Sequence, residues 1–201
     1  MKKQILPALA LLATATFAIP GHAAGFNYTY AQATYDDFNL DIGVTGIPDF
    51  DGDGFTGAGS FDLGKGFFVN GSFSFWDLDK TSADIDNWQV GGGWHMSLKP
   101  NLDLVFSGAL GKTKLSGGGT SVDPDFLAAR AAVRYRINKK FEIGGGIGIV
   151  DFDETGNETE IHFNGLWNFT NRISGIVEYR DNDLIESISI GARFYFKPKR
   201  K

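Results

Sequence analysis

The chain has 201 residues, of which 42% are hydrophobic, 14% aromatic and 21% charged, and this composition excludes a disordered or fibrous protein. It has no cysteine, which excludes a disulfide scaffold, a thiolate metal site and a cysteine nucleophile. The formal net charge of −5 argues against nucleic acid as the main partner.

The first 23 residues have the pattern of an export signal. A positive start at Met1-Lys2-Lys3 is followed by an apolar stretch over 5–19 and by small residues at Gly21 and Ala23. This stretch is too short for a spanning helix, which needs about 20 apolar residues. We therefore expect a signal peptide at 1–23, one domain at 24–196 and a basic tail at 197–201. No later segment is both long and uncharged, so the mature chain is either soluble outside the cytoplasm or spans a membrane as a barrel.

From Phe26 onward, apolar and polar residues alternate with a period of two, as they do on the two faces of a β-strand. The segment 67–76 is typical, because Phe67, Val69 and Phe73 share one face while polar residues occupy the other. The pattern predicts ten strands, with eight as the alternative, at 26–40, 54–63, 67–77, 86–97, 101–112, 123–136, 141–151, 158–169, 172–181 and 184–196. An even number of strands places both termini at the same end.

The connections between these strands are of two kinds. Short turns contain basic or turn-forming residues, at 64–66, 99–101, 138–140 and 170–172. Longer acidic connections alternate with them, at 41–53, 77–86, 112–123, 151–158 and 181–183. This sidedness is typical of bacterial outer-membrane barrels, which have short periplasmic turns and longer outer loops.

Two arrangements of such an antiparallel barrel are open. In a membrane barrel the apolar face meets lipid, whereas a soluble barrel would enclose that face around a small apolar ligand. Mid-strand charges on the polar face, aromatic residues at strand ends and the sidedness of the connections favour the membrane barrel.

One segment has a competing helical signal. Asp123-Pro124-Asp125 precedes an alanine-rich run, as at a capped helix start. A helix would mix Arg130 and Arg134 with apolar residues, whereas a strand separates them, so we predict a strand.

The last predicted strand, 189–196, places Gly191, Phe194 and Phe196 in the pattern of an assembly signal. It resembles the C-terminal strand of Gram-negative outer-membrane barrels, and with the export signal and the hairpin plan the chain resembles the OmpA/OmpX-like superfamily. The resemblance implies insertion by the barrel-assembly machinery, contact with outer-membrane lipid and lipopolysaccharide, and a monomeric state. The basic tail after Phe196 departs from the pattern, which normally ends at the aromatic residue.

Charged residues recur on the predicted inward face. They are Asp62, Asp103, Arg130, Arg134, Arg136, Glu142, Glu160, His162, Glu178, Arg180 and Arg193. Such charges require pairing or hydration. Glycines on the same face, including Gly144 and Gly148, leave room for the long arginine side chains. We interpret the set as a network that plugs the lumen, with a narrow conduit for ions or very small solutes as the alternative.

The sequence offers only a weak metal signal. Asp49, Asp51 and Asp53 alternate with other residues as in the first half of an EF-hand loop, but Ser60 occupies the twelfth position, where a glutamate is needed. We expect an acidic outer loop there, and no cofactor. A further hypothesis is that loop carboxylates share divalent cations with lipopolysaccharide phosphates; they are Asp77, Asp79, Asp84, Asp86, Asp151, Asp153 and Glu154.

No catalytic group is evident. His22 leaves with the signal peptide, while His95 and His162 fall mid-strand on the polar face without a serine at a motif-like spacing. We expect an outer-membrane barrel with a structural or surface-exposed role, no enzyme activity and no nucleic-acid partner. The alternatives are a narrow porin-like channel and the soluble ligand-binding barrel.

Overall fold

A computed structural model describes residues 25–41, 49–79, 81–153, 156–182 and 184–196. The predicted signal peptide and the basic tail lie outside these residues. The described strands are β1 (Tyr30–Leu40), β2 (Phe50–Gly64), β3 (Phe67–Leu78), β4 (Asp84–Lys99), β5 (Leu102–Gly117), β6 (Thr120–Val122), β7 (Asp125–Arg136), β8 (Phe141–Phe152), β9 (Gly156–Asn168), β10 (Ile173–Asn182) and β11 (Ile185–Tyr195). Within the described part of the chain, no helix has the length and apolarity needed to cross a membrane.

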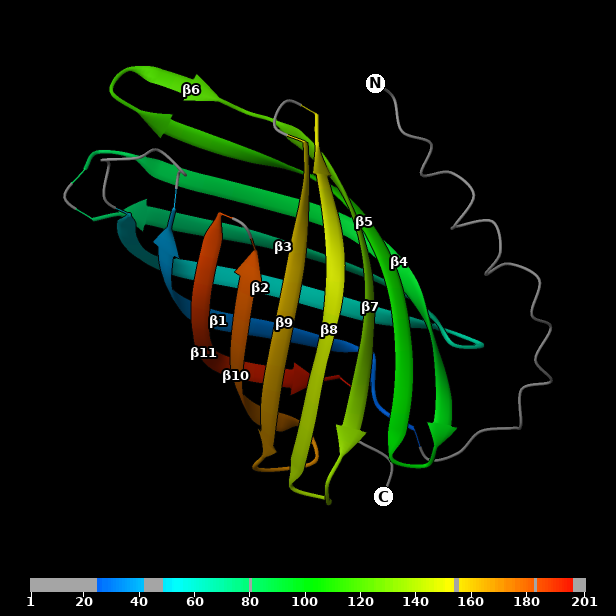
Figure 1. Ribbon diagram of the computed structural model, residues 1–201. Helices are drawn as coiled ribbons and strands as arrows, with labels where there is room; N and C mark the ends of the chain where they lie inside the picture. The colour runs from blue at the N-terminus through cyan, green and yellow to red at the C-terminus, as the bar shows by residue number, and fades with distance from the viewer. Residues whose placement is uncertain (1–24, 42–48, 80, 154–155, 183, 197–201) are drawn as a thin grey trace.

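Ten of these strands form a closed antiparallel barrel. Figure 1 shows the strands curving round into this barrel. Each strand pairs with its neighbour in the chain, except that β5 pairs with β7 and β1 pairs with β11. Tyr30 lies opposite Tyr195 in the β1–β11 pair, so β1 begins and β11 ends at the same end of the barrel. The short β6 only extends the tip of β5 into a hairpin. The predicted strand count and up-and-down topology are confirmed.

All four predicted short turns lie at the end of the barrel where β1 begins and β11 ends. We call this end the turn end and the opposite one the loop end. The loop-end connections are shorter than predicted, because β2 begins at Phe50, β4 begins at Asp84 and β5 continues to Gly117. Exposed acidic residues such as Asp51 and Asp125 do not end a strand here, because the backbone ladder continues through them.

The segment that starts with Asp123-Pro124-Asp125 is strand rather than helix. Strand β7 begins at Asp125, and Arg130 and Arg134 alternate with exposed residues such as Leu127 and Val133. The period of two therefore outweighs the local helix signal here, because it matches the register with β5 and β8 on either side.

The apolar face of the barrel lies outside. Its middle band consists of exposed side chains such as Phe55, Leu127, Ile147 and Ile190, each more than 60% exposed. Exposure of large apolar side chains all round a closed sheet suits contact with lipid and is unsuited to water. The soluble alternative requires these side chains to line the interior, so the structure is the reverse of that arrangement.

Candidate functional site: the barrel lumen

The eleven charged residues predicted for the lumen all occupy inward positions of their strands. Arg130, for example, points away from the face of β7 on which Leu127 and Val133 are exposed. Asp62 lies between Phe61 and Leu63, which are both exposed. The structure does not bring all eleven together. Asp62 lies at the turn end, where it accepts a hydrogen bond from the Gly64 amide. The others, apart from Arg193, form two layers, one in each half of the barrel.

The turn-end layer is built around a segment that enters the lumen. Residues 25–29, which we call the N-terminal segment, precede β1, and their Phe26 and Tyr28 side chains are buried against Phe68 and Val105. We predicted that the first strand starts at residue 26; this is wrong. The β1–β11 register begins at Tyr30 and Tyr195, so residues 26–29 have no strand opposite them in this ladder and turn into the barrel instead.

Arg134 clamps this segment. Its guanidinium lies over both aromatic rings, 4.7 Å from the centroid of Phe26 and 4.6 Å from that of Tyr28. Its Nε and Nη2 atoms donate to Oε1 of Glu142 at 2.8 and 2.6 Å. Arg136 adds a second cation on Phe26 and donates to the Gly25 carbonyl. Cation–π contacts of this kind strengthen where water is excluded.

Tyr28 is also held by a buried carboxylate. Its hydroxyl donates to Oδ2 of Asp103 at 3.0 Å, and Ser97 donates to the other carboxylate oxygen at 2.7 Å. His95 stacks on the Tyr28 ring with 3.9 Å between the ring centroids, and its Nδ1 lies 3.3 Å from Asp103. Asp103 is fully buried, so these contacts replace the water that its carboxylate would otherwise bind.

The second layer lies towards the loop end. Arg130 donates through Nε and Nη2 to the two carboxylate oxygens of Glu160, at 2.8 and 3.0 Å, and through Nη1 to Gln89. Gly148 stands directly between Arg130 and Glu160 in the register, and a Cβ there would come within 2.9 Å of the arginine side chain. This glycine therefore lets the ion pair span three strands, as the sequence suggested.

The remaining predicted residues complete this layer. Arg180 donates to Glu178 at 2.8 Å, and His162 lies 3.5 Å from Glu160. A second cluster is centred on the buried Asp36, whose carboxylate accepts hydrogen bonds from Thr34, Thr56 and Trp76. Asp36 was missed as a lumen residue, although its alternation with the exposed Tyr35 and Asp37 could have identified it.

The loop end of the lumen is apolar, which the sequence did not indicate. Phe38, Leu78 and Ile85 form one buried cluster, and Phe126, Ala128 and Val150 form another. These residues sit on the inward face, where the alternation predicted mainly polar side chains. The lumen is therefore filled by aromatic and aliphatic groups at both ends and by ion pairs between them.

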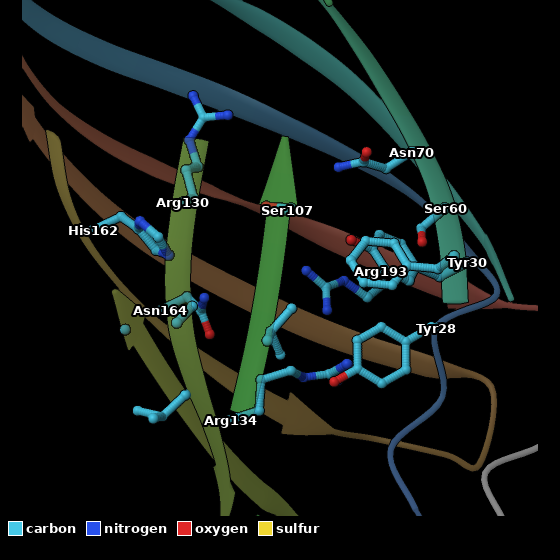
Figure 2. Close-up of a pocket in the computed structure, with 15 residues that line it drawn as sticks. Tyr28, Tyr30, Ser60, Asn70, Ser107, Arg130, Arg134, His162, Asn164 and Arg193 are labelled. Carbon is cyan, nitrogen blue, oxygen red and sulfur yellow. The ribbon is translucent and has the colours of Figure 1, made fainter. Parts of the chain in front are cut away.

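One cavity, of about 160 Å³, lies between the two layers. Figure 2 shows Ser60 and Asn70 on one side of it, His162 and Asn164 on the other, and Arg193 reaching between them. Arg193 belongs to β11, where it stacks on Tyr30 at 4.1 Å and donates two hydrogen bonds to Gln32.

The metal candidates do not form a loop. Asp51 and Asp53 belong to the extended strand β2, whereas an EF-hand-like loop would require the chain to turn at Gly52 and Gly54. Asp49 precedes that strand. In the described ranges, no group of three or more histidine, aspartate or glutamate side chains is arranged to hold a metal ion.

Gly191 and Phe194 lie in β11, and Phe196 directly follows this strand. Phe194 and Phe196 are exposed on the outer face, and their rings make an edge contact with 5.5 Å between centroids. Gly191 lies opposite Thr34 of β1, where a Cβ would collide with the Ala33 carbonyl. The glycine thus allows the close approach of the two strands that complete the barrel.

No protein-family model and no curated protein matches the sequence. Among solved structures, the translocator domain of the autotransporter NalP from Neisseria meningitidis is similar with a TM-score of 0.50 and 13% identity, over 86% of this chain and 89% of that one. The β domain of the Bordetella autotransporter BrkA has a TM-score of 0.50 and 12% identity, over 85% and 99%. Neisserial surface protein A has a TM-score of 0.46 and 10% identity, over 83% and 96%. At such identities the likeness concerns the fold, and the chain folds as a transmembrane β-barrel.

Proposed function

We propose that this chain is an integral outer-membrane protein of a Gram-negative cell, with a structural or surface-exposed role and a barrel closed to solutes. The observation that carries the proposal is the N-terminal segment lodged inside the barrel, where Arg134 lies over Phe26 and Tyr28. A segment clamped in this way blocks the turn end of a lumen that ion pairs and apolar clusters already fill.

The outer-membrane part of the proposal rests on three features. The export-signal pattern directs the chain out of the cytoplasm, the apolar side chains face outward, and the last strand resembles an assembly signal at Gly191, Phe194 and Phe196. On this basis the proposed partners are outer-membrane lipid, lipopolysaccharide and the barrel-assembly machinery. The finer resemblance to the OmpA/OmpX-like superfamily belongs to the same proposal.

Within this proposal the protein is not an enzyme. His95 lies beside Asp103 and beneath the Tyr28 ring, and His162 lies beside Glu160, so both imidazoles serve the packing of the lumen.

The second candidate is a narrow channel. The 160 Å³ cavity favours it, because the cavity shows that the lumen is not filled throughout and its polar lining could pass water or ions if the N-terminal segment moved. The closed barrel and the narrow channel differ in whether the N-terminal segment leaves the lumen.

Single-cysteine labelling in whole cells tests the proposal, because the natural chain has no cysteine. A maleimide too large to cross the outer membrane should label Thr120→Cys, which is exposed in the loop-end hairpin, and should label Lys139→Cys, in a short turn, only after the membrane is opened. Equal labelling of both sites in intact cells would contradict membrane insertion with this orientation.

Cysteine labelling also tests whether the lumen of the barrel is closed. Ser74 is buried on the inward face, and Ser74→Cys changes little in size. A small charged thiol reagent should leave this cysteine unmodified in the folded barrel and modify it after unfolding. Rapid modification in the folded state would favour the channel.

A further inference from the structure

Arg193 differs from the other lumen arginines that line or adjoin the cavity. Arg130, Arg134 and Arg180 each form an ion pair with a glutamate. Arg193 is only 7% exposed, yet in the described part of the chain it forms no ion pair. Its two hydrogen bonds go to the neutral Gln32, and it stacks on Tyr30, so no carboxylate touches its guanidinium. A buried guanidinium without a carboxylate in contact has room for an anion as its partner.

The cavity wall facing Arg193 has polar atoms without partners. Ser60 is 8% exposed and its hydroxyl makes no hydrogen bond with a described residue; the same holds for the buried Oδ1 of Asn70. The strand register sets Tyr30, Ser60 and Asn70 side by side on three adjacent strands. Unpartnered buried polar groups of this kind are rare in a folded protein and call for a ligand or water.

We propose that this cavity binds a small hydroxycarboxylate. Arg193 and the Ser60 hydroxyl can donate hydrogen bonds to a carboxylate of the ligand. The Oδ1 atom of Asn70 can accept a hydrogen bond from a neighbouring hydroxyl of the ligand. No aspartate or glutamate belongs to the described lining, and Glu160 and Glu142, the partners of the lining residues Arg130 and Arg134, are held in ion pairs.

The volume indicates how large a ligand this partly open cavity accommodates. A cavity of about 160 Å³ corresponds to roughly five waters at about 30 Å³ each, so it suits a molecule of about six to nine non-hydrogen atoms. Phe68, Val105 and Ala132 supply the apolar part of the wall. The carbon chain of the ligand would lie against them while its polar end faces Arg193.

Thermal unfolding of protein refolded in detergent with increasing sodium lactate, at constant ionic strength, tests this binding, because the ligand can then enter before the N-terminal segment closes the barrel. Binding to the folded state raises the midpoint as the ligand concentration passes its dissociation constant. Lactate should raise the midpoint more than propionate, which lacks the hydroxyl, while the uncharged lactamide should leave it unchanged. Because no membrane or current is involved, the result does not depend on whether the barrel conducts.

Arg193→Gln should weaken lactate binding at least tenfold, whereas Arg180→Gln, which alters a lumen arginine outside the cavity, should not. Ser60→Leu, which fills the cavity, should abolish binding and remains informative if Arg193→Gln fails to refold. The inference is overturned if lactamide or inorganic phosphate acts as strongly as lactate. It is also overturned if Ser60→Leu or a folded Arg193→Gln protein binds lactate normally.

Discussion

Arg134 joins two parts of the molecule that are far apart in the sequence. It pairs with Glu142 of the next strand and covers the rings of Phe26 and Tyr28 from the N-terminal segment. An arginine remains charged even when buried, so its position depends on a nearby carboxylate. Glu142 is only 1% exposed and depends on Arg134 in the same way.

Arg134→Ala should therefore lower the free energy of unfolding by about 3–5 kcal/mol, because it removes the cation that is paired with the buried Glu142. Urea unfolding of the detergent-refolded protein, followed by tryptophan fluorescence, measures the loss. Arg134→Met combined with Glu142→Gln removes both charges and should lose less. The control is Lys112→Ala, which breaks a solvent-exposed ion pair with Asp123 and should lose much less. Equal losses for Arg134→Ala and Lys112→Ala would contradict this account.

At the scale of the strands, four aspartates form a row across the loop end. Asp37 lies opposite Asp53, Asp53 opposite Asp77, and Asp77 opposite Asp84, on four adjacent strands. Like charges directly opposite each other destabilise a sheet. The backbone ladder through this row is formed nevertheless, so the strands are held together here against repulsion.

Asp77→Asn should raise the free energy of unfolding by about 0.2–1 kcal/mol at low salt, because Asp77 faces an aspartate on both sides. The gain should shrink as salt screens the repulsion. Asp86→Asn is the control, since Asp86 lies opposite Lys114 and its neutralisation removes an attraction. Denaturant midpoints at two salt concentrations measure both variants, and a gain for Asp86→Asn as large as for Asp77→Asn would refute the explanation.

The alternation of residue types predicted the strands and their faces but not their ends. Phe26 and Tyr28 alternate with Asn27 as a strand would, so the sequence could not show that β11 offers no partner before Tyr30. Likewise the aspartates at 51 and 53 resemble a loop in composition, whereas the register of β2 with β1 and β3 keeps them extended. Strand ends depend on which partner is present, and that is a property of the assembled sheet.

At the scale of the whole molecule, the barrel is apolar outside and charged within. The period of two was enough to place the eleven lumen charges on the inward face. It could not pair them, because Arg130 reaches Glu160 across Gly148 of the intervening strand, and such contacts depend on the register of three strands. The cavity beside Arg193 was equally beyond the sequence, since its walls come from strands at opposite ends of the chain.

Closure of the lumen by the N-terminal segment is the central claim, and single-channel conductance in a planar bilayer tests it most directly. The refolded wild-type protein should insert and remain silent. Phe26→Ala combined with Tyr28→Ala, which removes both rings beneath Arg134, should give discrete conductance steps, while the outward-facing control Phe163→Ala should be as silent as the wild type. Stable steps of equal size in the wild type and the double variant would contradict the claim, because the segment would then not be what closes the barrel.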